Sequence, residues 1–185
     1  MRPFDGRRVL LVVSGGIAAY KSAFLSRRLI QAGASVDVIL TEAAQRFVGA
    51  ETFEGITGRQ VHTKLWQTAM AHLDLGKSAD VIVVAPATAD LISSMAVGAA
   101  KDLASATLLA AEAPVIVCPA MNTRMWKHPA TQANICSLLK FGYDISGRLK
   151  DHLRKVKVVL GDWLSQKKLW PVLAKHLSHT LGLRG

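Results

Sequence analysis

The sequence predicts an α/β fold: a three-layer αβα domain built on a doubly wound parallel sheet, of the flavodoxin-like or Rossmann-like type. Two observations lead to this prediction. First, four short apolar runs are continuous rather than alternating, as expected for strands buried on both faces of a parallel sheet. Second, helix-like segments separate the runs, and this alternation is typical of doubly wound domains. The four predicted strands cover residues 9–13, 36–40, 81–85 and 115–118.

The helices between these strands are predicted from their start and stop signals. The first, over 17–32, follows the turn Ser14-Gly15-Gly16 and ends at Gly33, a typical helix stop. Residues 51–68 are less regular and are expected to hold a helix and a loop. Residues 87–111 should form one or two helices, and 129–141 another, ended by Gly142.

The pattern is weaker after Gly142. Residues 156–160 are apolar enough for a fifth strand. Beyond Pro171 the apolar side chains recur at helical spacing, which predicts an amphipathic closing helix with Trp170, Leu173, Leu177 and Leu181 on one face. The 185 residues fit a single domain over 1–185, with a divergent C-terminal part at 143–185.

Composition indicates a globular protein of the reduced cytoplasm. Half of the residues are hydrophobic and 19% are charged. No apolar run approaches the length of a membrane span, and no signal peptide is expected. Cys118 and Cys136 have neither metal-ligand spacing nor the number needed for a disulfide framework, so we expect no metal site.

The formal net charge is +10, and residues 146–185 contribute +7 of it through nine Lys or Arg against two Asp. A solvated basic face is the simplest interpretation. Attraction of phosphorylated ligands and weak nucleic-acid binding are the alternatives. Basic residues interleaved with aromatic ones, which would favour a nucleic-acid partner, are missing from the sequence, so nucleic acid is not an expected partner.

Each predicted strand is followed by a polar or glycine-rich turn. Because the carboxyl ends of parallel strands meet at one edge of the sheet, these turns should converge, and their convergence predicts a ligand crevice there. The turns are Ser14-Gly15-Gly16-Ile17, Thr41-Glu42-Ala43-Ala44, Pro86-Ala87-Thr88-Ala89-Asp90 and Pro119-Ala120-Met121-Asn122.

Several of these residues suit particular chemistry, each with a structural alternative. Ser14-Gly15-Gly16 suits a phosphate at a helix N-terminus, although a plain tight turn fits equally well. Thr41 and Thr88 offer hydroxyls to a phosphate or ribityl chain, or act as helix N-caps. His72 is either a structural histidine or a general base or acid near neutral pH.

The segment after the fourth predicted strand carries the most informative motif, Pro119-Ala120-Met121-Asn122-Thr123-Arg124-Met125-Trp126. One amide between two Met and a Trp suits a pocket for a flat apolar ring and one polar group. The pattern resembles the signature of the homo-oligomeric flavin-containing cysteine decarboxylases. The resemblance extends over residues 8–142 in the expected order and includes His72-Leu73-Asp74-Leu75, which matches the segment with the family's active-site histidine.

The resemblance implies an FMN-dependent carboxy-lyase acting on a phosphorylated small-molecule or peptidyl cysteine, foremost the conversion of 4′-phosphopantothenoylcysteine to 4′-phosphopantetheine in coenzyme A biosynthesis. It implies His72 as the base and Asn122 as the ligand of the substrate carboxylate. It also implies a homotrimer or dodecamer with sites between subunits. The implied FMN contacts are Ser14, Gly15, Gly16, Ile17, Thr41, Ala43, Thr88, Ala89, Asp90, Ser105, Ala120 and Met125.

Three departures from the family pattern leave an alternative open. Asp90 stands where the family usually has Asn, and Lys101 replaces an acid. After Gly142 the family's coenzyme A enzymes carry a flap with a reductive Cys, whereas this chain passes directly to Ser146-Gly147-Arg148-Leu149. A non-catalytic or regulatory FMN-binding protein of the same fold is therefore the second hypothesis. A flavin prenyltransferase is a lesser option, because the Asn122 motif disfavours it.

Overall fold

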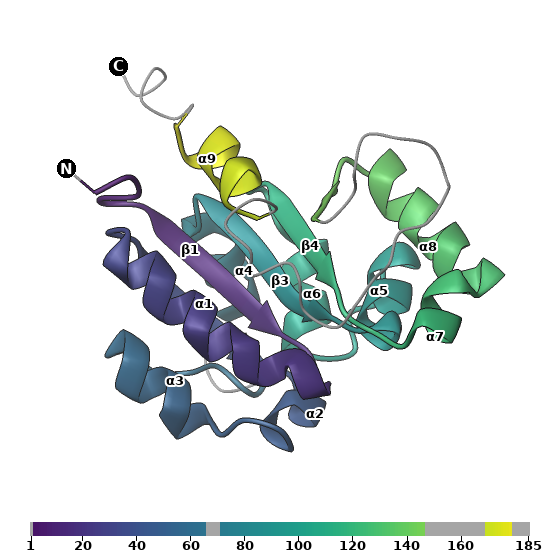
Figure 1. Ribbon diagram of the computed structural model, residues 1–185, viewed down its shortest axis with the longest axis horizontal. Coiled ribbons are helices and arrows are strands. Elements are labelled where there is room, and N and C mark those ends of the chain that lie inside the picture. The colour runs from purple at the N-terminus through teal and green to yellow at the C-terminus, as the bar shows by residue number, and fades with distance from the viewer. Residues whose placement is uncertain (1, 66–70, 147–168, 179–185) are drawn as a thin grey trace.

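The computed structural model describes residues 2–65, 71–146 and 169–178, with only the backbone of Ala71, His72 and Ser178. Among these residues, five strands form one parallel sheet in the order β2-β1-β3-β4-β5 (Figure 1). This is the flavodoxin-like order, whose ligand crevice lies at the carboxyl ends of the strands where the order reverses. The predicted fold class is confirmed. The strands are β1 (Arg8–Val13), β2 (Ser35–Leu40), β3 (Val81–Ala87), β4 (Val115–Pro119) and β5 (Asp144–Ile145).

Helices cover both faces of the sheet (Figure 1). On one face pack α1 (Tyr20–Gln31), α3 (Ala50–Thr57) and α9 (Trp170–Ser178). On the other pack α4 (Ala71–Ser78), α5 (Ala89–Ala96), α6 (Leu103–Leu109) and α8 (Pro129–Lys140). Three short helices follow strand ends: η1 (Ile17–Ala19), α2 (Glu42–Gln45) and α7 (Thr123–Lys127).

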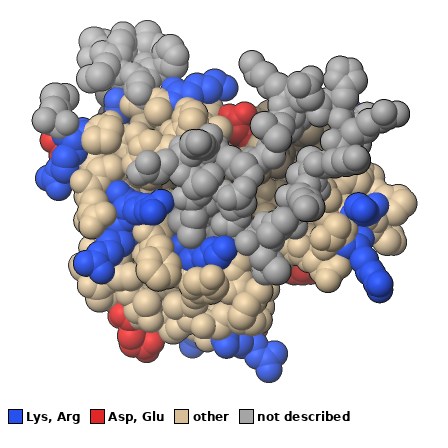
Figure 2. Space-filling view, in the orientation of Figure 1, with Lys and Arg blue, Asp and Glu red and all other residues tan. Residues whose placement is uncertain are grey.

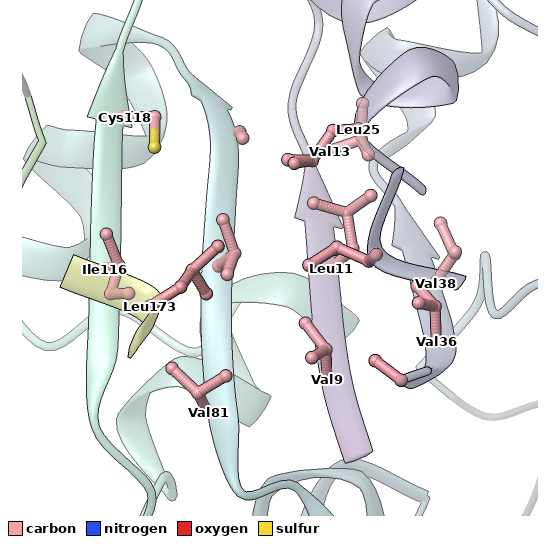
Figure 3. Close-up of a cluster of buried hydrophobic side chains, with 14 of the residues drawn as sticks. Val9, Leu11, Val13, Leu25, Val36, Val38, Val81, Ile116, Cys118 and Leu173 are labelled. Atoms are coloured by element: carbon pink, nitrogen blue, oxygen red, sulfur yellow. The ribbon is translucent and has the colours of Figure 1, made fainter. Parts of the chain in front are cut away.

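Alternate residues of each central strand enter different cores. In β1, Val9, Leu11 and Val13 join the core under α1, α3 and α9, where Figure 3 shows them in line along the strand. Leu10 and Val12 join the core on the opposite face. All five are at most 1% exposed. Burial on both faces is why the apolar runs of the sequence are continuous.

The predicted closing helix is present as α9. Its Leu173 lies over the β3–β4 side of the sheet, near Ile116 (Figure 3), and both Leu173 and Leu177 are buried. The Trp170 ring packs on Phe4, with the ring centroids 5.1 Å apart. The fourth residue of the predicted stripe, Leu181, lies outside the described residues. Residues far apart in the chain thus share one core.

Several elements differ from the sequence prediction. β5 is two residues long and forms only because Asp144 and Ile145 pair with Ile116 and Val117, so it has no local pattern to detect. α4 was not predicted as a helix. The first helix is split into η1 and α1, and β3 continues past Pro86 to Ala87. The possible strand at 156–160 lies outside the described residues.

Charge on the described surface is dispersed. On the face seen in Figure 2, Lys and Arg side chains stand in several separate groups, with fewer Asp and Glu. The basic segment 146–185 lies mostly outside the described residues. Within the described part of the chain, none of the helices combines the length and the apolar character needed to cross a bilayer.

Candidate functional site

A cavity of about 680 Å³ lies at the carboxyl ends of β1 to β4, where the four predicted turns come together. This volume is typical of a site for a cofactor-sized ligand. The structure brings eleven of the twelve residues predicted to contact FMN to its lining, together with Asn122. The eleven are Ser14, Gly15, Gly16, Ile17, Thr41, Ala43, Thr88, Ala89, Asp90, Ala120 and Met125.

Five helices begin at this cavity. Their N-cap residues are Gly16 of η1, Thr41 of α2, Thr88 of α5, Asp102 of α6 and Asn122 of α7, and all five line it. A helix N-terminus carries partial positive charge and backbone N–H groups that no carbonyl of the helix can satisfy. Convergence of five such ends makes the cavity suited to an anionic ligand.

The turn after β1 offers the most backbone donors. The N–H groups of Gly15, Gly16, Ile17 and Ala18 donate to no acceptor among the described residues. Ser14 is different, because its hydroxyl donates to the Pro86 carbonyl at 2.6 Å and accepts from the Thr88 N–H at 3.0 Å. Ser14 therefore joins the turns after β1 and β3, and the N–H groups beside it are available to a phosphate.

Gly15 lies directly against α2. A Cβ added to Gly15 would be 2.3 Å from the Ala43 Cβ and 2.6 Å from the Ala43 carbonyl carbon, closer than atoms can approach. Gly16 has more room, since an added Cβ would meet only the Thr88 Cγ2 at 3.6 Å. Contact with α2, rather than backbone conformation, thus requires glycine at position 15.

The two threonines act as N-caps without losing the ability to bind a ligand. The Thr41 hydroxyl oxygen accepts from the Ala44 N–H at 3.2 Å, and the Thr88 oxygen accepts from the Leu91 N–H at 3.4 Å. The capping bond uses a lone pair, so each hydroxyl proton remains a possible donor to a ligand in the cavity. The structural and functional interpretations of these residues are therefore compatible.

Asn122 is held in one orientation. Its Oδ1 accepts from the Arg124 N–H at 2.8 Å as the N-cap of α7. The capping bond identifies the carbonyl side of the amide, which leaves the NH₂ group as the side that can donate to a ligand. Exposed apolar side chains complete the lining, with Ile17 64% and Met125 50% exposed.

The first two departures from the family pattern lie next to each other. The Lys101 Nζ is 3.5 Å from the Asp90 Oδ1, and both residues line the cavity. Both side chains are more than half exposed, so the pair adds little to stability. Its effect is on local charge, because the carboxylate introduced at position 90 is balanced by the ammonium introduced at 101.

Two predicted site residues are not placed in the cavity. Ser105 is buried behind Asp102, to whose Oδ1 its hydroxyl donates at 2.6 Å in the capping box of α6, and it is not part of the lining. The sequence motif could not distinguish this capping role from ligand contact. His72 is the second residue of α4, and its side chain lies outside what the structure describes.

Arg46 and Asp102 also line the cavity, although neither was predicted as a ligand contact. Arg46 stands four residues after Glu42, which belongs to the predicted turn after the second strand. In a helix that starts at Thr41 the two side chains lie on one face, so this spacing could have placed Arg46 at the same edge of the sheet. Asp102 had a weaker signal as an acid before an apolar run, which is typical of an N-cap.

The two cysteines differ in environment. Cys118 is fully buried in β4, and burial raises the pKa of its thiol to about 12, although the nearby Ser146 hydroxyl opposes this shift. Cys136 lies exposed on α8. Neither lines the cavity.

We expect native protein to react with one equivalent of a thiol reagent at pH 8, at Cys136, because Cys118 is both shielded and protonated. Thiol titration before and after unfolding in guanidinium chloride measures this difference. The Cys136→Ser variant should lose the fast-reacting thiol and retain the one exposed by unfolding. A second thiol that reacts rapidly in the native protein would contradict the buried environment of Cys118.

Comparison with known proteins agrees with the geometry of the cavity. The Flavoprotein family model matches residues 2–162. The coenzyme A biosynthesis bifunctional protein CoaBC of Mycolicibacterium smegmatis is 48% identical over 149 residues, which are 77% of this chain and 36% of that protein. CoaBC of Vibrio cholerae is 46% identical over 147 residues, 77% of this chain and 37% of that protein. The chain thus spans little more than a third of the length of these curated relatives.

Comparison with solved structures indicates the same family of proteins. The FMN-dependent cysteine decarboxylase SpaF superposes with a TM-score of 0.80 at 30% identity, covering 95% of this chain and 97% of SpaF. A PPC decarboxylase mutant complexed with pantothenoylaminoethenethiol superposes with a TM-score of 0.66 at 28% identity, covering 78% of this chain and 85% of that one. The family expected from the sequence motifs is confirmed: the chain belongs to the Flavoprotein family, in the group that includes CoaBC and the FMN-dependent cysteine decarboxylases.

Proposed function

We propose that this chain binds FMN in the cavity and decarboxylates a cysteinyl substrate, foremost 4′-phosphopantothenoylcysteine. The observation that carries the proposal is the convergence of five helix N-termini on one cavity that also has exposed apolar side chains. An anionic cofactor with a flat ring needs both features. The 48% identity to CoaBC and the superposition on PPC decarboxylase support this choice of substrate.

The residues of the cavity fit FMN. The unsatisfied N–H groups of residues 15–18 would hold its phosphate, with the Thr41 and Thr88 hydroxyls as further donors. Ile17 and Met125 would cover its ring with apolar surface. When bound, FMN supplies a two-electron oxidation of the cysteine side chain, which makes loss of carbon dioxide possible.

The side chains of the protein would position the substrate and move its proton. The Asn122 NH₂ group would donate to the substrate carboxylate, and the cap bond from Arg124 would keep it in that orientation. His72 would take a proton from the substrate, a role that follows from the family resemblance. The Asp90–Lys101 pair leaves no uncompensated carboxylate at that part of the rim, which removes one reason for a purely binding role.

We further propose that the protein is a homotrimer or a dodecamer. Ile17, Tyr20 and Phe24 are 64%, 49% and 60% exposed and recur at helical spacing along η1 and α1, beginning at the cavity. An exposed apolar stripe of this kind is typical of a contact surface. The family resemblance implies assembly in threes, so light scattering should give a mass that is a multiple of three chains, each of 19.9 kDa.

The function is tested in two steps. The purified protein should be yellow and release FMN on denaturation, and a colourless protein that fails to bind added FMN would remove both the decarboxylase and the FMN-binding alternative. The holoprotein is then incubated with 4′-phosphopantothenoylcysteine, and mass spectrometry follows loss of carbon dioxide. Loss at the level of the His72→Asn variant would favour the non-catalytic alternative. Because the chain departs from the family pattern after Gly142, the product should be the ene-thiol, with two hydrogens fewer than the saturated thiol. Repeated turnover then requires dioxygen in the assay as the final acceptor of the two electrons removed from the substrate.

A further inference from the structure

Arg46 is the one cation lining the cavity that has no acidic partner among residues 2–65, 71–146 and 169–178. It lies immediately after α2 as the C-cap residue, and its backbone N–H donates to the carbonyls of Ala43 and Ala44. The backbone is thus held within the helix turn. Its side chain is exposed at the cavity, so the guanidinium is accessible to a ligand.

Three of the other four charged side chains that line the cavity are already engaged. Lys101 is paired with Asp90, and the Asp102 carboxylate accepts from the Ser105 N–H at 2.8 Å and from the Ser105 hydroxyl at 2.6 Å. Glu42, the fourth, is the first residue of α2. It is four residues before Arg46, yet no ion pair within 4 Å joins the two. The Arg46 guanidinium therefore retains its full capacity for an anion.

Arg46 and Asn122 belong to opposite sides of the cavity. Arg46 follows β2, Asn122 follows β4, and β1 and β3 lie between these strands. Three strand spacings correspond to about 14 Å. A ligand that places a carboxylate at Asn122 and reaches Arg46 must therefore be extended, and Arg46 suits a second anionic group at its far end.

We propose that Arg46 binds a phosphate monoester at the β2 side of the cavity and so selects phosphorylated ligands. This inference rests on the proposed function. A guanidinium presents a planar fork of donors that matches phosphate oxygens in pairs, which an ammonium cannot do. The contact of Gly15 with Ala43 holds α2 beside the turn at residues 15–18, whose backbone N–H groups donate to no acceptor among the described residues.

The phosphate that Arg46 binds belongs either to FMN or to the cysteinyl substrate, and both groups are phosphate monoesters. One is the FMN phosphate, if it extends from the turn at residues 15–18 toward α2. The other is the phosphate of the cysteinyl substrate, if its carboxylate lies at Asn122. The first would make Arg46 a cofactor ligand, and the second would make it a determinant of substrate specificity.

The Arg46→Gln variant tests the inference with two measurements. Apoprotein is titrated with FMN and with riboflavin by flavin fluorescence, and holoprotein is assayed with 4′-phosphopantothenoylcysteine and with its dephosphorylated form. We expect the wild-type preference for the phosphorylated member of one pair to fall by about tenfold or more, as for loss of a charge-assisted hydrogen bond. A fall in the FMN-to-riboflavin preference assigns the cofactor phosphate, and a fall in the substrate preference assigns the substrate phosphate.

Three controls make the outcome specific. Arg27→Gln removes an exposed arginine of α1 that does not line the cavity, and should change neither preference. Arg46→Lys should restore part of the lost preference, because the charge remains. Lys101→Gln removes a cation that is paired with Asp90, so it should lower the preference for the phosphorylated ligand less than Arg46→Gln does. The inference is overturned if both preferences persist in Arg46→Gln, or if Arg27→Gln changes them equally. Wild-type protein that neither binds FMN nor decarboxylates would instead contradict the proposed function.

Discussion

Substitution of Gly15 by alanine is expected to lower the free energy of unfolding by about 1–3 kcal/mol, as for overpacking of a well-packed site. The new Cβ would overlap the Cβ, the carbonyl carbon and the carbonyl oxygen of Ala43, at 2.3, 2.6 and 2.8 Å. Two of these atoms belong to the backbone, so no side-chain rotation relieves the overlap. The turn after β1 or the start of α2 must move, and both line the cavity, so FMN affinity should fall as well.

Gly16→Ala is the matched control. An added Cβ there meets only the Thr88 Cγ2 at 3.6 Å, an ordinary contact, and the φ of −169° is extended backbone that alanine adopts readily. Urea unfolding of the two apoproteins, followed by FMN titration of each, measures the difference. We expect Gly16→Ala to remain within about 0.5 kcal/mol of the wild type. Equal destabilisation by both substitutions would show that contact with Ala43 is not what requires glycine.

Substitution of Asn122 by aspartate is expected to reduce kcat/KM by about 10²- to 10³-fold while leaving the fold intact. An aspartate oxygen can accept from the Arg124 N–H as the asparagine Oδ1 does, so the N-cap of α7 is preserved. The change replaces the NH₂ donor by a second carboxylate oxygen. The substrate carboxylate then loses a charge-assisted hydrogen bond of about 1.5–3 kcal/mol and meets a like charge.

Asn122→Ser separates capping from substrate binding. Serine is a good N-cap but carries neither the amide donor nor a negative charge, so its kcat/KM should lie between those of the wild type and Asn122→Asp. Steady-state kinetics, thermal unfolding and FMN titration of the three proteins provide the comparison. If the loss of activity follows the loss of thermal stability in both variants, Asn122 acts only as a cap and the proposed carboxylate contact is wrong.

The sequence predicted the parts of the site that depend on one strand and the turn after it. Each of the four runs is buried on both faces, so continuous hydrophobicity identified it without knowledge of its neighbours. The turns after Val13, Leu40, Ala85 and Cys118 could then be assigned to one edge of the sheet, because parallel strands all end there. Ten of the eleven FMN contacts that the family resemblance implies and that line the cavity lie in these four turns, and the eleventh is Met125.

Residues whose role depends on a partner elsewhere in the chain could not be assigned in this way. Asp90 and Lys101 were recognised as two separate departures, and only the fold makes them an ion pair. Ser105 is a different case: it matched a family segment, but its hydroxyl donates to Asp102 three residues earlier in the capping box of α6, and it is buried away from the cavity lining. α4 (Ala71–Ser78) was missed for a different reason, because its apolar positions are too few to predict a helix on their own.

The sequence by itself therefore determined the fold class, the edge of the sheet that carries the site and the chemical character of the turns there, because these follow from local patterns. Only the tertiary structure decided that the start of α6 joins the four predicted turns, that the charges of Asp90 and Lys101 cancel and that Arg46 has no acidic partner among the described residues. Charge balance and packing depend on distances between residues far apart in the chain. Those distances follow from strand order and helix packing, which no local pattern records.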